Sequence, residues 1–232
     1  MEGYPMIIPT TNEELDRRLG GIPFPALIMI EGDHGTGKSV MGAQFVYGLL
    51  SAGKSGYIIT TEQSTYGYLK KMREVKIDLI PFFLRGKLGM APLNTSRFSW
   101  NSSLAKKLLY FILEFIRRVK DFVLIDSFTV ISTFARGEDL MEFLKGLRVA
   151  VSNGKEIIIT VHPNAFSEDM VTRVRSEADV YFRTSSASIG NRRVKVIEKI
   201  KTSESTFGSD SISFDVDPSL GIKVVPLTLS RA

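Results

Sequence analysis

The sequence predicts an α/β fold in which a mostly parallel, twisted sheet carries helices on both faces, followed by a C-terminal antiparallel hairpin extension. Three observations predict it: short apolar runs alternate with helical segments, a glycine-rich loop follows the first of these runs, and the C-terminal part shows strand patterns with little helix. The chain has 232 residues, of which 44% are hydrophobic and 24% charged. This size and composition predict one globular domain, residues 1–232.

The strands of the parallel sheet are expected at the short apolar runs. These lie at residues 27–30, 57–61, 88–92, 122–126 and 157–162. Because helical segments separate them, right-handed crossovers would keep the strands parallel and cover both faces of the sheet. Ligands of such sheets bind beyond the carboxyl ends of the strands.

The helices are expected between these runs, at residues 12–18, 40–51, 66–75, 104–118 and 139–151. Ser64 or Thr65 is expected to cap the third helix, and residues 101–103 offer a cap for the fourth. Gly53 stands where a left-handed residue would end the second. The C-terminal strands are expected at residues 180–183, 194–199, 211–216 and 222–225.

The composition excludes several classes of protein. Without cysteine the chain forms no disulfide and holds no thiolate metal site, which favours a cytoplasmic location. No signal peptide is visible near Met1, and the apolar helix around residues 108–116 is too short to cross a membrane and contains Glu114, so we expect no membrane insertion. A net charge of +5 permits an anionic partner but fits an ordinary basic surface equally well.

A phosphate-binding loop is indicated by the spacing Gly-x-x-x-x-Gly-Lys-Ser directly after the first apolar run. Its glycines let backbone N–H groups curl round a triphosphate, while Lys38 supplies a positive charge and Ser39 a hydroxyl for Mg²⁺. The helix that follows points its positive N-terminus at the phosphates. The residues expected to bind the nucleotide are Gly32, Asp33, His34, Gly35, Thr36, Gly37, Lys38, Ser39 and Val40.

Three polar residues at other strand ends are candidates to complete this site. Asp126 ends a buried strand and is expected to hold Mg²⁺ together with Ser39; Ser127 follows it, so no catalytic base comes from that position. Glu62 either orients the attacking water or is an acid near the start of the next helix. His162 either contacts the γ-phosphate or is structural. His34 occupies a free position of the loop and is expected to be exposed.

With these residues together, the chain resembles the RecA-like P-loop ATPases of the circadian-clock KaiC type. Among them it is most similar to the accessory ATP-binding proteins of the archaeal flagellum, the archaellum. The resemblance is carried by the loop and by residues 19–23, 60–62, 124–127, 160–163, 214–218 and 221–226. The sequence departs from the family at Phe24-Pro25, where relatives often have a small turn.

The resemblance implies ATP as the nucleotide and places the strand that ends at His162 between the loop strand and the Asp126 strand. It implies that Lys199 and Lys201 reach into the nucleotide of a neighbouring subunit in a ring, expected to be a hexamer. Alternatively, these two lysines are outward side chains of an alternating strand. The family's partners are the archaellum motor ATPase and a membrane platform protein at the cytoplasmic face of the membrane, and its hydrolysis is weak.

Two other functions are compatible with parts of the sequence. A recombinase paralogue would bind single-stranded DNA through a long mobile loop after the His162 strand, but only residues 163–166 separate that strand from the next helix start, so nucleic acid is not favoured. An active KaiC-like ATPase or autokinase would need a strong base and phosphorylatable residues, for which Ser203, Ser205 and Thr206 are candidates.

Overall fold

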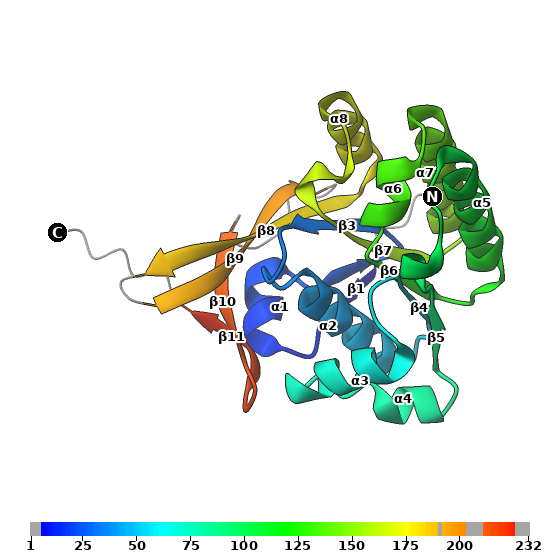
Figure 1. Cartoon of the computed structure of the whole chain (residues 1–232). Coiled ribbons are helices and arrows are strands. Elements are labelled where there is room, and N and C mark those ends of the chain that lie inside the picture. The colour runs from blue at the N-terminus through cyan, green and yellow to red at the C-terminus, as the bar shows by residue number, and fades with distance from the viewer. Residues whose placement is uncertain (1–5, 190–191, 203–210, 226–232) are drawn as a thin grey trace.

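One sheet organises the molecule (Figure 1). The computed structural model describes residues 6–189, 192–202 and 211–225, and within these the sheet has nine strands in the order β11-β10-β9-β8-β3-β7-β6-β4-β5. The strands from β8 to β5 in this order are parallel, whereas β9, β10 and β11 continue the sheet antiparallel from β8. The predicted α/β fold is therefore confirmed, and the C-terminal extension lies at the sheet edge as expected.

The first five parallel strands match the expected apolar runs to within two residues, whereas the strand expected at residues 180–183 extends to Ile189 and pairs parallel to the loop strand. The parallel strands are β3 (Leu27–Gly32), β4 (Gly56–Thr60), β5 (Leu88–Pro92), β6 (Phe122–Asp126), β7 (Glu156–Val161) and β8 (Val180–Ile189). The extension contains β9 (Arg192–Thr202), β10 (Ser211–Asp217) and β11 (Gly221–Val225), and a small separate sheet pairs β1 (Met6–Ile8) with β2 (Ile22–Phe24). Since β7 lies between β3 and β6, the predicted neighbours of the loop strand are correct.

Helices cover both faces of the sheet (Figure 1). One face carries α1 (Glu13–Leu19), α2 (Lys38–Ser51), α3 (Thr65–Glu74) and α4 (Ile80–Leu84). The other carries α5 (Ser102–Arg118), α6 (Thr129–Phe134), α7 (Gly137–Ser152) and α8 (Glu168–Glu177). Short 3-10 turns occur at η1 (Thr95–Arg97) and η2 (Pro163–Ala165).

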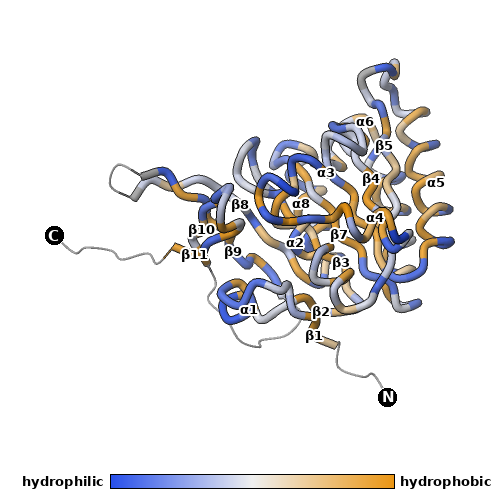
Figure 2. Tube along the Cα trace, turned by 90° about the horizontal axis from the view of Figure 1, so that it is seen from below, coloured by the Kyte–Doolittle hydropathy of each residue, from blue (hydrophilic) through white to orange (hydrophobic). Residues whose placement is uncertain are grey.

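Two apolar cores result from the alternation of side chains along the strands. In β3, Ile28 and Ile30 join the core beneath α1, α2 and α3, whereas Leu27 and Met29 join the core beneath α5, α7 and α8. Figure 2 shows the corresponding apolar interior, with hydrophilic residues concentrated on the outer turns. Because the loop strand is buried on both faces, its carboxyl end is held in a fixed position.

The helix ends follow local sequence signals. Asn12, Ser64 and Asn101 accept backbone N–H groups as N-caps of α1, α3 and α5, and Gly53 has a φ of +84° beyond the end of α2. Ser64 rather than Thr65 is thus the cap of α3. The short helix α6 was not expected, because six residues are too few for a periodic apolar pattern.

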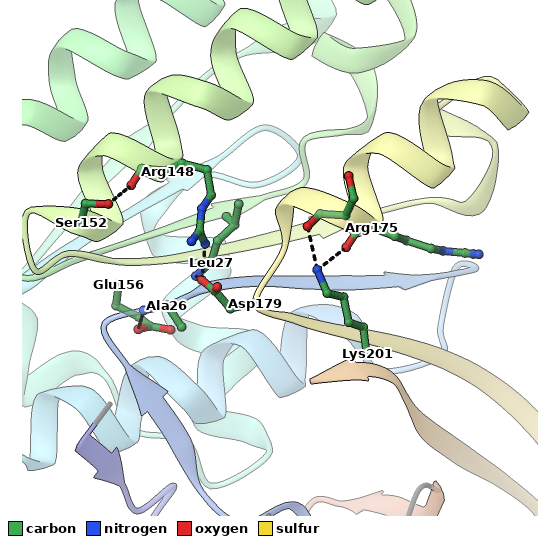
Figure 3. A network of polar contacts seen from close by, with 9 residues as sticks. Ala26, Leu27, Arg148, Ser152, Glu156, Arg175, Asp179 and Lys201 are labelled. Carbon is green, nitrogen blue, oxygen red and sulfur yellow. Dashed lines mark hydrogen bonds and ion pairs between the residues drawn. The ribbon is translucent and has the colours of Figure 1, made fainter. Parts of the chain in front are cut away.

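The amino ends of the central strands are held by two carboxyl groups (Figure 3). Glu156 Oε2 accepts a hydrogen bond from the N–H of Ala26 at 2.8 Å. Asp179 Oδ2 accepts a hydrogen bond from the N–H of Leu27 at 2.8 Å and forms an ion pair with Arg148 at 2.5 Å. These carboxyl groups therefore fix the start of the strand that carries the phosphate-binding loop.

Candidate functional site

The loop predicted to bind phosphate joins β3 to α2 at the carboxyl edge of the sheet. Gly35 and Gly37 have φ angles of +77° and +98°, which side chains other than glycine rarely adopt. At Gly32 an added Cβ would lie 2.0 Å from Thr184 Oγ1. Thr36 Oγ1 donates to Asp33 O at 2.7 Å and lies 2.8 Å from Thr184 Oγ1. The loop is therefore curled on itself and packed against β8.

Lys38 lies at the first position of α2 with its ammonium group inside the curve of the loop. Its Nζ donates to Asp33 O at 2.7 Å, and the residue is 7% exposed. Burial lowers the pKa of Lys38, and the charges of Asp126, Glu62 and Asp33 oppose this shift. A positive charge is thus kept at the point where the loop would place a phosphate.

Asp126 and Ser39 form the pair predicted to hold Mg²⁺. Asp126 Oδ1 accepts from Ser39 Oγ at 3.1 Å and from Thr160 Oγ1 at 2.5 Å. Burial raises the pKa of Asp126, whereas the hydroxyl groups of Thr160 and Ser39 lower it. A buried carboxylate beside a serine hydroxyl is the hard oxygen donor set that Mg²⁺ prefers.

The surroundings of Asp126 also fit a magnesium ion. Buried Tyr68 Oη has no hydrogen-bond partner among the described residues, and burial together with the Asp126 carboxylate raises its pKa. In the part of the chain that is described, no group of three or more histidine or acidic side chains is arranged to hold a metal. Mg²⁺ usually takes one or two protein ligands and completes its shell with phosphate and water, so Ser39 and Asp126 would be enough to hold it.

One pocket of about 310 Å³ brings most of the predicted residues together. Its lining includes His34, Gly35, Gly37, Lys38, Ser39, Val40, Glu62, Asp126 and His162. Glu62 lies between this pocket and a neighbouring one of about 580 Å³ at the ends of β4 and β5. Because Ser64 caps α3, the helix does not need Glu62 as its hydrogen-bond cap.

His162 follows β7 directly, and its backbone N–H donates to Thr129 Oγ1 at 3.0 Å. The rings of His162 and His34 are in contact, with centroids 4.0 Å apart and planes tilted by 48°. Burial lowers the pKa of His162, as do the charges of Lys38 and His34. His34 is exposed, as predicted, and its ring also contacts His162, the residue considered for contact with the γ-phosphate.

Five residues in the pocket lining were missed by sequence reasoning: Lys71, Val75, Ser127, Lys195 and Val216. Lys195 comes from β9, and its Cδ lies 3.2 Å from the place where a Cβ on Gly37 would be. Several lysines in α3 and β9 have similar sequence surroundings, so no sequence signal distinguishes those that face the pocket. Only the tertiary packing makes that choice, and for Lys195 it is the packing of the extension against the loop.

Lys199 and Lys201 do not line this pocket. Lys199 Nζ donates to Leu19 O at the end of α1. Lys201 Nζ donates to two carbonyl groups in the last turn of α8, to Ser176 O at 2.7 Å and to Arg175 O at 3.0 Å. Figure 3 shows Lys201 directed toward Arg175. The register between β8 and β9 shifts between these two lysines. Their side chains therefore point to opposite faces of the sheet.

The expectation of two lysines alternating on one face therefore does not describe this strand, and within one protomer each lysine caps a helix C-terminus. Their insertion into a neighbour's site stays a prediction. The candidate phosphorylation sites Ser203, Ser205 and Thr206 lie outside the described residues.

The fold and the loop define the class of this protein as a RecA-like P-loop protein. The family model described as "ATPase: KaiC" matches residues 8–228. The archaeal flagellar ATP-binding protein FlaH of Sulfolobus acidocaldarius is 60% identical over 98% of this chain and all of its own length. FlaH of Methanocaldococcus jannaschii is 28% identical over 94% of each chain.

The crystal structure of the flagellar accessory protein FlaH from Methanocaldococcus jannaschii superimposes with a TM-score of 0.82 and 27% identity, covering 96% of this chain and 99% of that one. The chain therefore belongs to the FlaH family of KaiC-type ATPases. Within the described residues, no helix combines the length and the apolar character needed to cross a membrane.

Proposed function

We propose that this chain binds ATP with Mg²⁺ and that the bound nucleotide controls its assembly, with slow hydrolysis or none. The observation that carries the proposal is the meeting of Lys38, Ser39, Asp126 and His162 in one pocket beyond the ends of β3, β6 and β7. Open α/β sheets bind their ligands at this edge. The FlaH relatives are named as ATP-binding proteins, which supports ATP as the nucleotide.

Each residue has a role that follows from its position. The loop N–H groups and Lys38 would bind the phosphates, while Ser39 and Asp126 would hold Mg²⁺ in place of the hydrogen bond that now joins them. When bound, Mg²⁺ neutralises charge on the phosphates. His162 directly follows β7, the strand beside the loop strand, and lines the same pocket, where it would contact the terminal phosphate.

Slow hydrolysis is the expectation because the candidate base is poorly held. Glu62 lines the pocket, but no described residue forms a hydrogen bond with its carboxylate. A general base contributes most when its geometry is fixed relative to the attacking water. ATP would then remain bound long enough to act as a signal.

The setting we propose is the archaellum, at the cytoplasmic face of the membrane. The FlaH relatives are named as archaeal flagellar proteins, and this chain matches one of them over its whole length. The proposed assembly is a ring, a hexamer, whose partners are the motor ATPase and the membrane platform protein. A DNA-binding role is not favoured, because the segment after β7 is the short turn η2, and α8 begins only three residues after that turn ends.

The experiment that tests this proposal measures the mass of the protein in solution with and without ATP and Mg²⁺, together with the release of phosphate. We expect a larger species with ATP and Mg²⁺ and little phosphate. Rapid phosphate release with unchanged mass would mean that the protein is an active ATPase and that ATP does not control its assembly. If neither ATP nor ADP binds, the whole proposal is wrong.

A second experiment tests the role of the β9 lysines in assembly. If Lys199 and Lys201 contact a neighbour's nucleotide, replacing both with alanine abolishes the ATP-dependent species while each protomer still binds ATP. Because each lysine also caps a helix, the single variants and their thermal unfolding are measured alongside. Intact rings formed by the double variant would reject the contact between subunits.

A further inference from the structure

The chain's two histidines are in contact with each other, and neither phosphate binding by the loop nor metal binding by Ser39 and Asp126 requires this contact. The sequence contains only His34 and His162, which are 128 positions apart. They come from different elements, the phosphate-binding loop and the end of β7, yet their ring centroids are 4.0 Å apart at the pocket wall. A contact that joins the loop to the neighbouring strand end depends on the shape of the loop.

The backbone and the side chain of His162 are held by different parts of the molecule. The backbone N–H donates to Thr129 Oγ1, and that hydroxyl lies 2.6 Å from Ser127 Oγ, so the main chain is fixed by residues following β6. The imidazole instead packs on the ring of His34, which belongs to the loop. The direction of the imidazole is therefore set by the segment that would surround the phosphates.

We propose that His34 is a positioning residue that directs His162 toward the terminal phosphate, so that the pair distinguishes ATP from ADP. This inference rests on the proposed nucleotide function and adds a residue to it. An imidazole can donate a hydrogen bond to the γ-phosphate of ATP, whereas ADP has no group at that place. Without the His34 ring, the His162 side chain gains rotamers that point away from the nucleotide.

The charges around the pair make its protonation sensitive to the nucleotide. Asp33, Lys38 and Glu62 act directly on His162. Further titratable groups line the same pocket: Lys71 from α3, Asp126 from β6 and Lys195 from β9. Two imidazolium ions at this separation repel each other, so the pair holds one proton more readily than two. The negative charge of a terminal phosphate beside His162 favours the protonated form of its imidazole.

The protonated form of His162 forms a stronger, charge-assisted hydrogen bond with phosphate than the neutral ring does, so the preference for ATP over ADP increases as the pH falls through the pKa of His162 in the complex. His34 lowers the pKa of His162. Replacing His34 with phenylalanine keeps an aromatic ring in contact but removes this repulsion, and the pH profile should therefore move to higher pH.

The test compares the dissociation constants of ATP and ADP, each with excess Mg²⁺, for the full chain from about pH 5 to pH 8. His34→Ala should reduce the ratio of ATP affinity to ADP affinity by about tenfold. His34→Phe should restore most of the ratio at low pH and shift its midpoint upward. His162→Gln measured in the same buffers corrects for the ionisation of the nucleotide itself.

The outcomes separate this inference from the function on which it rests. If the unmodified chain prefers ATP and His34→Ala shows the same ratio and the same pH profile, His34 does not position His162, although nucleotide binding stands. If the unmodified chain binds neither nucleotide, the proposed function fails first. Thermal unfolding without nucleotide checks that each variant is folded, and we expect no loss there because His34 is exposed.

Discussion

The two ends of the central strands use carboxyl groups in opposite ways. At the amino ends, Glu156 and Asp179 accept backbone N–H groups of the chain itself, and Asp179 also pairs with Arg148 (Figure 3). At the carboxyl ends, Asp126 accepts hydrogen bonds from the hydroxyl groups of Ser39 and Thr160 beside an open pocket.

The difference lies in what can replace the partners of each carboxyl group. A backbone N–H at the start of a strand cannot leave without loss of the sheet, and an N–H left unpaired in the interior costs about 1–3 kcal/mol. A hydroxyl group on the rim of a pocket can exchange the carboxylate for a metal ion. Burial of a carboxyl group therefore does not by itself indicate a binding residue. A hydrogen-bond partner that a ligand can replace is the better indication.

The largest expected effect is the loss of nucleotide binding in Lys38→Ala. The ammonium group lies inside the loop and would form charge-assisted hydrogen bonds with phosphate, so ATP affinity should fall by about a hundredfold. Isothermal titration calorimetry measures this loss. The free energy of unfolding should change little, and unchanged ATP affinity would remove the basis for assigning the loop to phosphate.

A matched pair of amide variants tests the comparison between the two ends. Asp126→Asn should weaken Mg²⁺-dependent ATP binding by about tenfold, because an amide is a poorer ligand for Mg²⁺ than a carboxylate. Asp179→Asn should lower the free energy of unfolding by about 0.5–1 kcal/mol, because the amide oxygen can still accept the Leu27 N–H but no longer forms the partly exposed ion pair with Arg148.

Chemical unfolding and nucleotide titration of both variants provide the comparison. We expect Asp179→Asn to bind ATP as tightly as the unmodified chain and Asp126→Asn to unfold at nearly the same denaturant concentration. The distinction between the two ends would be lost if both variants changed stability and affinity to the same extent.

Glu62→Gln is expected to have a smaller effect. If Glu62 orients water, phosphate release should fall by about tenfold, below the contribution of a well-positioned base, since no described hydrogen bond holds the carboxylate. ATP affinity should be retained. A steady-state phosphate assay detects the change, and an unaltered rate would mean that Glu62 has no part in hydrolysis.

The smallest effect concerns Glu156 and appears only as pH dependence. Burial raises the pKa of Glu156 well above its usual value, although the Ala26 N–H lowers it. Because the pKa is higher in the folded than in the unfolded chain, stability is lost as the pH rises from the unfolded pKa through the folded one. Glu156→Gln should remove this loss.

Thermal unfolding of both chains from about pH 4 to pH 8 tests this expectation. The difference in midpoint between Glu156→Gln and the unmodified chain should increase in favour of the variant as the pH rises. A difference that stays constant over this range would show that Glu156 does not change its ionisation on folding.

Much of the fold was predictable because its signals are local. The buried strands read as apolar runs, Asn12 and Gly53 mark helix ends, and the loop is specified by the spacing of a few consecutive residues. The pocket was predictable to the extent that parallel strands place their carboxyl ends at one edge, which brings Asp126 and His162 beside the loop.

The remaining features depend on contacts between distant segments. The register shift between β8 and β9 decides that Lys199 and Lys201 point to opposite faces, and the packing of the extension decides that Lys195 faces the loop. Side-chain direction along a strand alternates strictly only while the register is regular, so one extra residue reverses every later position. The sequence by itself determined the fold class and the phosphate-binding loop, because short-range spacing defines both. Only the tertiary structure decided which lysines reach the pocket and that His34 meets His162, because strand register and sheet order are set by the whole chain.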